Sequence, residues 1–191
     1  MPTVFTHVVS AVALGAIYSR PEKSSRFWVL AIFCAVVPDA DVIGFALGIK
    51  YGDLLGHRGF SHSLCFALIA GLVVTTLAFK SIPRFSRPWW YLVLFFSCAT
   101  ASHGLLDALT NGGLGIAFFS PFDSTRYFLP WRPLQVSPIG LPAFLSFRGL
   151  DVLISEFVWI WIPAGFLALV VVGLRHLRNG RWLRVRRFSD K

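Results

Sequence analysis

Seven histidine and aspartate residues lie in or beside apolar segments of this chain. They are His7, Asp39, Asp41, His57, His62, His103 and Asp107. Each such side chain is unfavourable in apolar surroundings: an aspartate at the centre of a membrane costs about 2.5–3.5 kcal/mol of insertion free energy. Neutral imidazoles and carboxylates gathered in an apolar place are the usual ligands of divalent metal ions. The residue types therefore predict a polar site inside an apolar protein, with all seven side chains as candidate metal ligands.

His103 and Asp107 are four residues apart, which on a helix places both side chains on one face, one turn apart. Such a pair can ligate one metal ion, or one side chain can ligate while the other bridges to a second ion. A histidine–aspartate hydrogen bond that stabilises a helix bundle is the alternative, and the pair taken alone favours that alternative.

Asp39 and Asp41 flank one alanine and follow Pro38. On an ideal helix the two carboxylates would point about 200° apart, but a proline loosens the helix enough for both to turn inward. Two unpaired carboxylates would repel each other, and a divalent cation removes that cost. The carboxylate that is not a ligand could orient a water molecule or act as general base. Capping of a short helix is the alternative interpretation.

The densest polar cluster is His57-Arg58-Gly59-Phe60-Ser61-His62-Ser63. We expect His62 to begin a helix, with Ser61 as its N-cap, so that the helix N-terminus and Arg58 form an anion site for a phosphate oxygen. Snorkelling of Arg58 to the membrane surface is the alternative. The candidate catalytic residues are Asp39, Asp41, Arg58 and His62.

Composition predicts an integral membrane protein. Of the 191 residues, 55% are hydrophobic and 14% are charged, whereas soluble domains average about 45–50% and about 25%. We expect an all-α membrane-embedded domain over residues 1–174, with about five transmembrane helices. The apolar segments are 4–18, 27–49, 60–79, 89–109 and 152–174.

The basic residues predict the topology. The loops 19–26 and 80–88 and the tail 175–191 hold 13 of the 18 lysines and arginines, and the net charge is +9. The positive-inside rule then puts the N-terminus outside and the tail in the cytoplasm, with the seven polar residues at one depth near the outer face. Residues 110–150, rich in glycine, proline and aromatic residues, become an outer interfacial segment. Because the tail directly follows an apolar segment, we assign its charge to anionic lipid headgroups, with no nucleic-acid partner.

The ordered set of motifs resembles the YdjM-type inner-membrane proteins, which are described as membrane-bound metal-dependent hydrolases. The resemblance rests on His7, Pro38-Asp39-Ala40-Asp41, the cluster 57–63, His103-x-x-x-Asp107 followed by Thr110-Asn111-Gly112-Gly113, and the stretch 126–133. It implies a bacterial inner-membrane location. That family is remotely similar to zinc-dependent phospholipase C and single-strand nucleases, which are helical enzymes with a three-metal cluster.

The resemblance also implies ligand roles. His7 resembles a ligand of one metal that is bridged by Asp107, while Asp39 or Asp41, His57 or His62, and His103 resemble ligands of its neighbour. A third metal would need further ligands, for which Glu156 and His176 are the candidates, and the topology puts His176 on the opposite side. We therefore expect two Zn²⁺ ions, with Mn²⁺ or Fe²⁺ as alternatives.

The function expected is hydrolysis of a phosphoester in a lipid or lipid-linked substrate by cation-activated water at the outer face of the membrane. Arg58, Arg126 and Arg132 are candidate ligands of the substrate phosphate, although Arg126 and Arg132 fit lipid-interface anchoring, together with Trp131, equally well. A metal or proton transporter is one alternative, but it would place ionisable groups at several depths. A non-catalytic protein with a closed, four-ligand structural metal site is the other.

Overall fold

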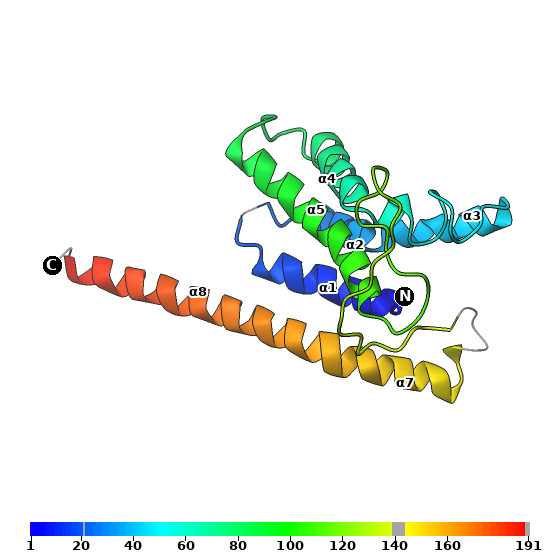
Figure 1. Ribbon diagram of the computed structural model, residues 1–191. Helices are drawn as coiled ribbons and strands as arrows, with labels where there is room; N and C mark the ends of the chain where they lie inside the picture. The colour runs from blue at the N-terminus through cyan, green and yellow to red at the C-terminus, as the bar shows by residue number, and fades with distance from the viewer. Residues whose placement is uncertain (21, 139–143, 190–191) are drawn as a thin grey trace.

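The protein is described by a computed structural model that covers residues 1–20, 22–138 and 144–189, with side chains described up to residue 178 (Figure 1). The described residues form helices joined by loops and contain no strand, which confirms the all-α fold. The elements are α1 (Val4–Ile17), α2 (Ser25–Val36), the 3₁₀ turn η1 (Val37–Val42), α3 (Ile43–Ala46), the 3₁₀ turn η2 (Phe60–His62), α4 (Leu64–Ala78), α5 (Arg87–Ala108), α7 (Phe147–Glu156), the π turn η3 (Phe157–Trp161) and α8 (Ile162–Ser189).

Three helical stretches among the described residues are long and apolar enough to cross a bilayer: Ser25–Ala46, Arg87–Ala108 and Phe147–Arg178. The helices α1 and α4 are apolar but shorter. The five predicted apolar segments are thus all helical, and three of them have full spanning length. The helix α8 continues without a break to Ser189 and so includes most of the predicted basic tail, residues 175–191.

The core of the bundle lies where α2 packs against α5. Its buried residues are mostly aromatic or small: Phe27, Ala31, Cys34, Phe79, Leu92, Phe95, Phe96 and Ala99. The α4–α5 hairpin and the α1–α2 pair flank this core, and α7, η3 and α8 form one long rod that lies along α1 (Figure 1). Serine hydroxyls cap the N-termini of α2, α4 and α5 by accepting hydrogen bonds from backbone N–H groups in the first turn.

Four helix ends meet at one end of the bundle: α1 and α4 begin there, and α2 and α5 end there (Figure 1). The loop 47–59 and the irregular segment 109–138 gather at the same end, while α8 ends at the opposite end of the molecule. Two isolated β-bridges, Thr110–Leu134 and Ile116–Tyr127, tie the irregular segment together. Residues 139–143 of the predicted outer segment lie outside the described residues.

Glu156 fastens the start of α1 to the long rod. Its fully buried carboxylate accepts hydrogen bonds from the backbone N–H of Thr3 (2.5 Å), the hydroxyl of Thr3 (2.5 Å) and the hydroxyl of Thr6 (2.6 Å). The indole N–H of Trp161 donates to the same Thr6 hydroxyl at 2.7 Å. Glu156, considered above for a third metal, therefore works as a structural acceptor, and the exposed His176 lies on α8 beside the residues at the end of α1.

Replacing Glu156 by alanine should lower the free energy of unfolding by at least about 3 kcal/mol, because three donors on Thr3 and Thr6 lose a charged acceptor in a buried place. Thermal unfolding of the detergent-purified protein measures this. Asp151→Ala, an exposed acid on the same rod, is the matched control and should shift the unfolding free energy by less than about 0.5 kcal/mol. Equal melting temperatures for the two variants would contradict the role given to Glu156.

Candidate metal centre

The structure brings the seven predicted polar side chains together from five parts of the chain. His7 lies on α1, Asp39 and Asp41 in η1, His57 in the loop after α3, His62 at the end of η2, and His103 and Asp107 on α5. Short distances connect each of them to at least one other member of the set. The predicted convergence is thus confirmed, and metal ligation by these residues remains a prediction.

An inner group of four residues has the arrangement of a metal site. Asp39, His62, His103 and Asp107 each offer one ligand atom, and these atoms all lie within 4.8 Å of one another. Nε2 of His103 lies 3.2 Å from Oδ1 of Asp39, and Nε2 of His62 lies 3.6 Å from the same oxygen and 3.7 Å from Oδ2 of Asp107. Two imidazole nitrogens with two carboxylates are a donor set that Zn²⁺, Mn²⁺ and Fe²⁺ all accept.

The ligand atoms of this inner group are buried and lack hydrogen-bond partners. They are Oδ1 of Asp39, Nε2 of His62, Nε2 of His103 and both carboxylate oxygens of Asp107. Buried polar atoms in native proteins are almost always paired, and unpaired carboxylates are the most costly of them. A divalent cation could take one ligand atom from each of the four residues, so the residues present fit such an ion.

The ring of His103 is oriented by the backbone. Its Nδ1 lies 2.7 Å from the carbonyl oxygen of Ala35, in the last turn of α2, where carbonyls lack partners within the helix. Because a carbonyl can only accept, Nδ1 carries the proton and Nε2 directs its lone pair into the inner group. Gly104 assists this arrangement, since a Cβ there would lie 2.8 Å from the carbonyl oxygen of His62 and would push η2 away from α5.

Asp41 lies outside the inner group and holds its neighbours in place. Its carboxylate accepts hydrogen bonds from Nδ1 of His57 (2.7 Å), the hydroxyl of Ser61 (2.6 Å) and the backbone N–H of Arg58 (3.2 Å). Nδ1 of His62 is 3.2 Å away, so the opposite nitrogen of that ring faces the inner group. Asp41, His57 and His62 also offer atoms within 4.8 Å of one another, but hydrogen bonds already account for that cluster. The geometry thus favours Asp39 and His62 as ligands.

Asp39→Asn and Asp41→Asn should separate these roles. The first change removes a charged ligand atom and should abolish cation binding, whereas the second weakens only the support of His62 and should lower cation affinity about 10–100-fold. Isothermal titration with Zn²⁺ of the chelator-treated protein measures both. A larger loss for Asp41→Asn than for Asp39→Asn would reverse the assignment.

The local structure around His62 differs from the sequence prediction. Ser63, and not Ser61, is the N-cap of α4, and its hydroxyl accepts a hydrogen bond from the backbone N–H of Phe66 at 3.0 Å. His62 therefore ends a 3₁₀ turn and does not begin the helix. The prediction was wrong because both serines precede the same apolar run, so the sequence does not say which of them caps the helix. In the structure Ser61 lies in the 3₁₀ turn η2, and its hydroxyl donates to Asp41 instead.

Arg58 is fully buried, so the snorkelling alternative is wrong. Its Nε lies 2.9 Å from Oδ2 of Asp107, while Nη1 donates to the carbonyl of Gly112 (2.8 Å) and Nη2 to the hydroxyl of Thr110 (3.1 Å). The guanidinium thus neutralises Asp107 and anchors the Thr110-Asn111-Gly112-Gly113 loop. Gly113 has φ +89°, and a Cβ there would lie 2.4 Å from Nη1 of Arg58. The role of Arg58 as a phosphate ligand stays a prediction that would require it to leave these partners.

Arg126 and Arg132 differ in how they are held. Arg126 donates to the backbone carbonyls of His57 (3.0 Å) and Tyr51 (3.0 Å), and so clamps the loop 47–59 to the segment 109–138. Arg132 is exposed and lies 4.8 Å from the ring of Phe128. Within the described chain, Arg132 is the phosphate candidate whose guanidinium has no hydrogen bond or ion pair.

His7 lies directly beside the inner group. Its ring stacks on that of His103 at 3.7 Å with an interplanar angle of 9°, and its Nε2 lies 3.7 Å from Oδ1 of Asp107. Both ring nitrogens are buried without hydrogen-bond partners. Asp107 thus has one oxygen toward His7 and the other toward His62, which is the arrangement that a bridging carboxylate needs.

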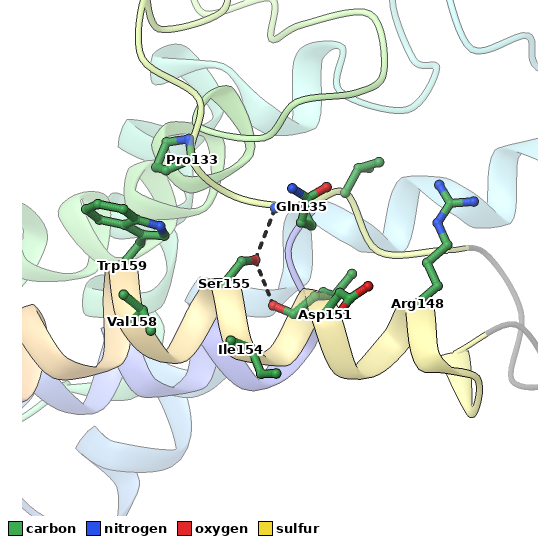
Figure 2. Close-up of a pocket in the computed structure, with 10 residues that line it drawn as sticks. Pro133, Gln135, Arg148, Asp151, Ile154, Ser155, Val158 and Trp159 are labelled. Atoms are coloured by element: carbon green, nitrogen blue, oxygen red, sulfur yellow. Dashed lines mark hydrogen bonds between the residues drawn. The ribbon is translucent and has the colours of Figure 1, made fainter.

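A separate cavity of about 500 Å³ lies between the segment 109–138 and the rod (Figure 2). The backbone N–H of Gln135 donates to the hydroxyl of Ser155 (3.1 Å), which donates to the carbonyl of Val152 (2.8 Å), and Arg148 and Trp159 line the rim. None of the seven candidate ligands lines this cavity, so it is distinct from the metal centre.

Fold and centre together define a helical membrane protein with a histidine–aspartate cluster at one end of its bundle. The chain matches the YdjM inner membrane protein family over residues 1–179 and belongs to that family. It is 35% identical over 167 residues to the inner membrane protein YbcI of Escherichia coli (strain K12), and this alignment covers 87% of the chain and 95% of YbcI. No solved structure shows significant similarity to it. The remote similarity to zinc-dependent phospholipase C stays a prediction.

Proposed function

We propose that this protein is a membrane-bound metal-dependent hydrolase that cleaves a phosphoester of a lipid or lipid-linked substrate. The observation that carries the proposal is the group of buried ligand atoms without a hydrogen bond on Asp39, His62, His103 and Asp107, at the end of a membrane protein's bundle. A divalent cation held there would supply a Lewis acid for the phosphoryl oxygen and would activate water at neutral pH.

The remaining residues have supporting roles in this proposal. Asp41 keeps His62 aimed at the inner group, and the carbonyl of Ala35 does the same for His103. Arg58 holds Asp107 in its ionised form inside the protein. Of the two carboxylates considered for orienting water, Asp41 is the one outside the inner group, but its oxygens already accept hydrogen bonds, so we assign it to positioning.

Two cations are proposed, as the family resemblance implies. The inner group supplies the ligands for one, and His7 with the second oxygen of Asp107 supplies the start of a shell for its neighbour. Zn²⁺ is the first choice because three imidazoles are available, with Mn²⁺ and Fe²⁺ as alternatives. Of the three arginines, Arg132 is the one that could bind a substrate phosphate without giving up a described hydrogen bond or ion pair.

A structural metal site is the second candidate function. It is favoured by the fact that the inner group already offers four protein ligands, which would complete a closed tetrahedral shell. A transporter receives less support, because the candidate ligands lie together at one end of the bundle and not at successive depths.

Phosphorus NMR of the detergent-purified protein tests the proposal. The protein is loaded with Zn²⁺, Mn²⁺ or Fe²⁺ and incubated with phosphatidylglycerol, phosphatidylethanolamine or a polyprenyl phosphate. Release of a phosphorylated headgroup or phosphate, lost after chelation and restored by the metal, supports hydrolysis. Stoichiometric metal without turnover of any of these substrates would favour the structural site.

A further inference from the structure

A second polar site lies at the end of the bundle opposite the metal centre. A cavity of about 270 Å³ opens where α1 ends, the α1–α2 loop turns and α8 passes by. Four basic side chains from two distant parts of the chain line it, namely Arg20, Lys23, Arg175 and His176. Tyr18 and Ser19 also line it.

Within the part of the chain that the structure describes, no ion pair neutralises the basic side chains of this cavity. Among the described residues, no carboxylate forms an ion pair with Arg20, Lys23 or Arg175, and the adjacent Glu22 carboxylate accepts from the hydroxyl of Tyr18 (3.4 Å) instead. Burial lowers the pKa of Lys23, and the positive charge of Arg175 lowers it further. Like charges therefore lie around an open space, and an anion bound there would relieve their repulsion.

The cations are also held in position. The guanidinium of Arg20 lies 4.0 Å above the ring of Tyr91, and Nζ of Lys23 donates to the carbonyl of Ala16 at 3.3 Å. Ala16 and Val172 form an apolar wall, and Arg175 stands at the end of the apolar stretch Phe147–Arg178. Basic side chains at such a border meet the phosphate region of a bilayer.

We propose that this cavity binds a phosphate group, as carried by an anionic phospholipid headgroup or by a free phosphate compound. The apolar wall beside the cations favours the lipid as the source, because acyl chains can continue along the exposed face of α8. The site does not depend on the proposed hydrolase activity, since it shares no residue with the metal centre. A phosphate group bound in this cavity would hold the rod formed by α7, η3 and α8 against α1, at the end of the bundle opposite the metal centre.

Native mass spectrometry of the full-length protein from detergent tests this site, with phosphatidylglycerol and phosphatidylcholine as probes. Each basic residue removed should weaken binding of phosphatidylglycerol about fivefold, so the triple variant Arg20→Gln, Lys23→Gln, Arg175→Gln should lose on the order of 100-fold. The control replaces Lys80, Arg84 and Arg87 by glutamine, which removes the same charge from the α4–α5 loop and the first residue of α5, outside the cavity. If the triple variant does not fold, Arg175→Gln alone serves as the test, because Arg175 makes no described hydrogen bond whose loss would destabilise the protein.

The proposal predicts that wild type and the loop control retain phosphatidylglycerol over phosphatidylcholine, and that the cavity variants do not. Inorganic phosphate is the second arm: displacement of the retained lipid by millimolar phosphate would support the phosphate site with a free compound as its source, and resistance would support the lipid. Equal retention by wild type and by both the triple and the Arg175→Gln variants would overturn the site, as would equal losses in the cavity and loop variants. Metal content stays unchanged in every variant, which keeps this test separate from that of the metal centre.

Discussion

Replacing His103 by alanine is expected to abolish both cation binding and phosphoester hydrolysis. The change removes one of the two inner imidazole nitrogens and leaves Asp39 and Asp107 facing each other across the group. Loss of a partner outside the metal shell already costs about 10–100-fold in affinity, so loss of a ligand should cost more than about 100-fold. Isothermal titration with Zn²⁺ and phosphorus NMR measure the two effects separately.

His176→Ala is the matched control for this prediction. It removes the remaining histidine outside the cluster, on the exposed surface of α8, and should leave cation affinity and turnover as in wild type. Wild-type affinity in His103→Ala would contradict the inner group as the metal site. A loss of turnover with cation binding intact would instead place His103 in catalysis without ligation.

Replacing Arg58 by glutamine should give the largest loss of stability. Arg58 and Asp107 are both fully buried, and removing one partner leaves the carboxylate without its countercharge, which costs about 3–5 kcal/mol in proteins. The cost is increased by the loss of the bonds to Gly112 and Thr110 that hold the adjoining loop. Thermal unfolding of the chelator-treated protein measures the effect, and added Zn²⁺ should recover part of it by giving Asp107 a new countercharge.

Two further variants make this prediction specific. Arg58→Lys keeps the positive charge, but an ammonium group cannot reach Asp107, Gly112 and Thr110 together as the guanidinium does. Its stability should therefore lie between those of wild type and Arg58→Gln. Arg132→Gln removes an exposed arginine from the same end of the bundle and should change the unfolding free energy by less than about 0.5 kcal/mol. An Arg58→Gln protein as stable as Arg132→Gln would show that the ion pair with Asp107 does not support the fold.

The sequence could predict which residues meet but not how each one is used. The spacing of His103 and Asp107 alone places them on one helix face. The other candidates flank the ends of apolar segments, and helices that cross the same membrane bring such ends to a common depth. The choice between Asp39 and Asp41 depends on the 3₁₀ geometry of η1, which sets which carboxylate faces His103. Spacing within a four-residue motif does not determine that geometry.

The contacts that the sequence did not predict are made by backbone atoms or by residues far apart in the chain. The carbonyl of Ala35, which orients His103, carries no side-chain signal. Glu156 reaches Thr3 across 153 positions, and nothing in the apolar stretch around it indicates that partner. Glu156 directly precedes the π turn η3, and π turns are frequent at functional sites, but the sequence alone does not reveal this turn.

Elemental analysis of the purified wild-type protein, after dialysis against metal-free buffer, tests the central claim most directly. Our account predicts at least one equivalent of zinc, manganese or iron per chain, rising to two if His7 and Asp107 hold the second ion, and removable by a chelator. Protein that is free of these metals as purified, and that takes up none after incubation with each of them, would contradict it.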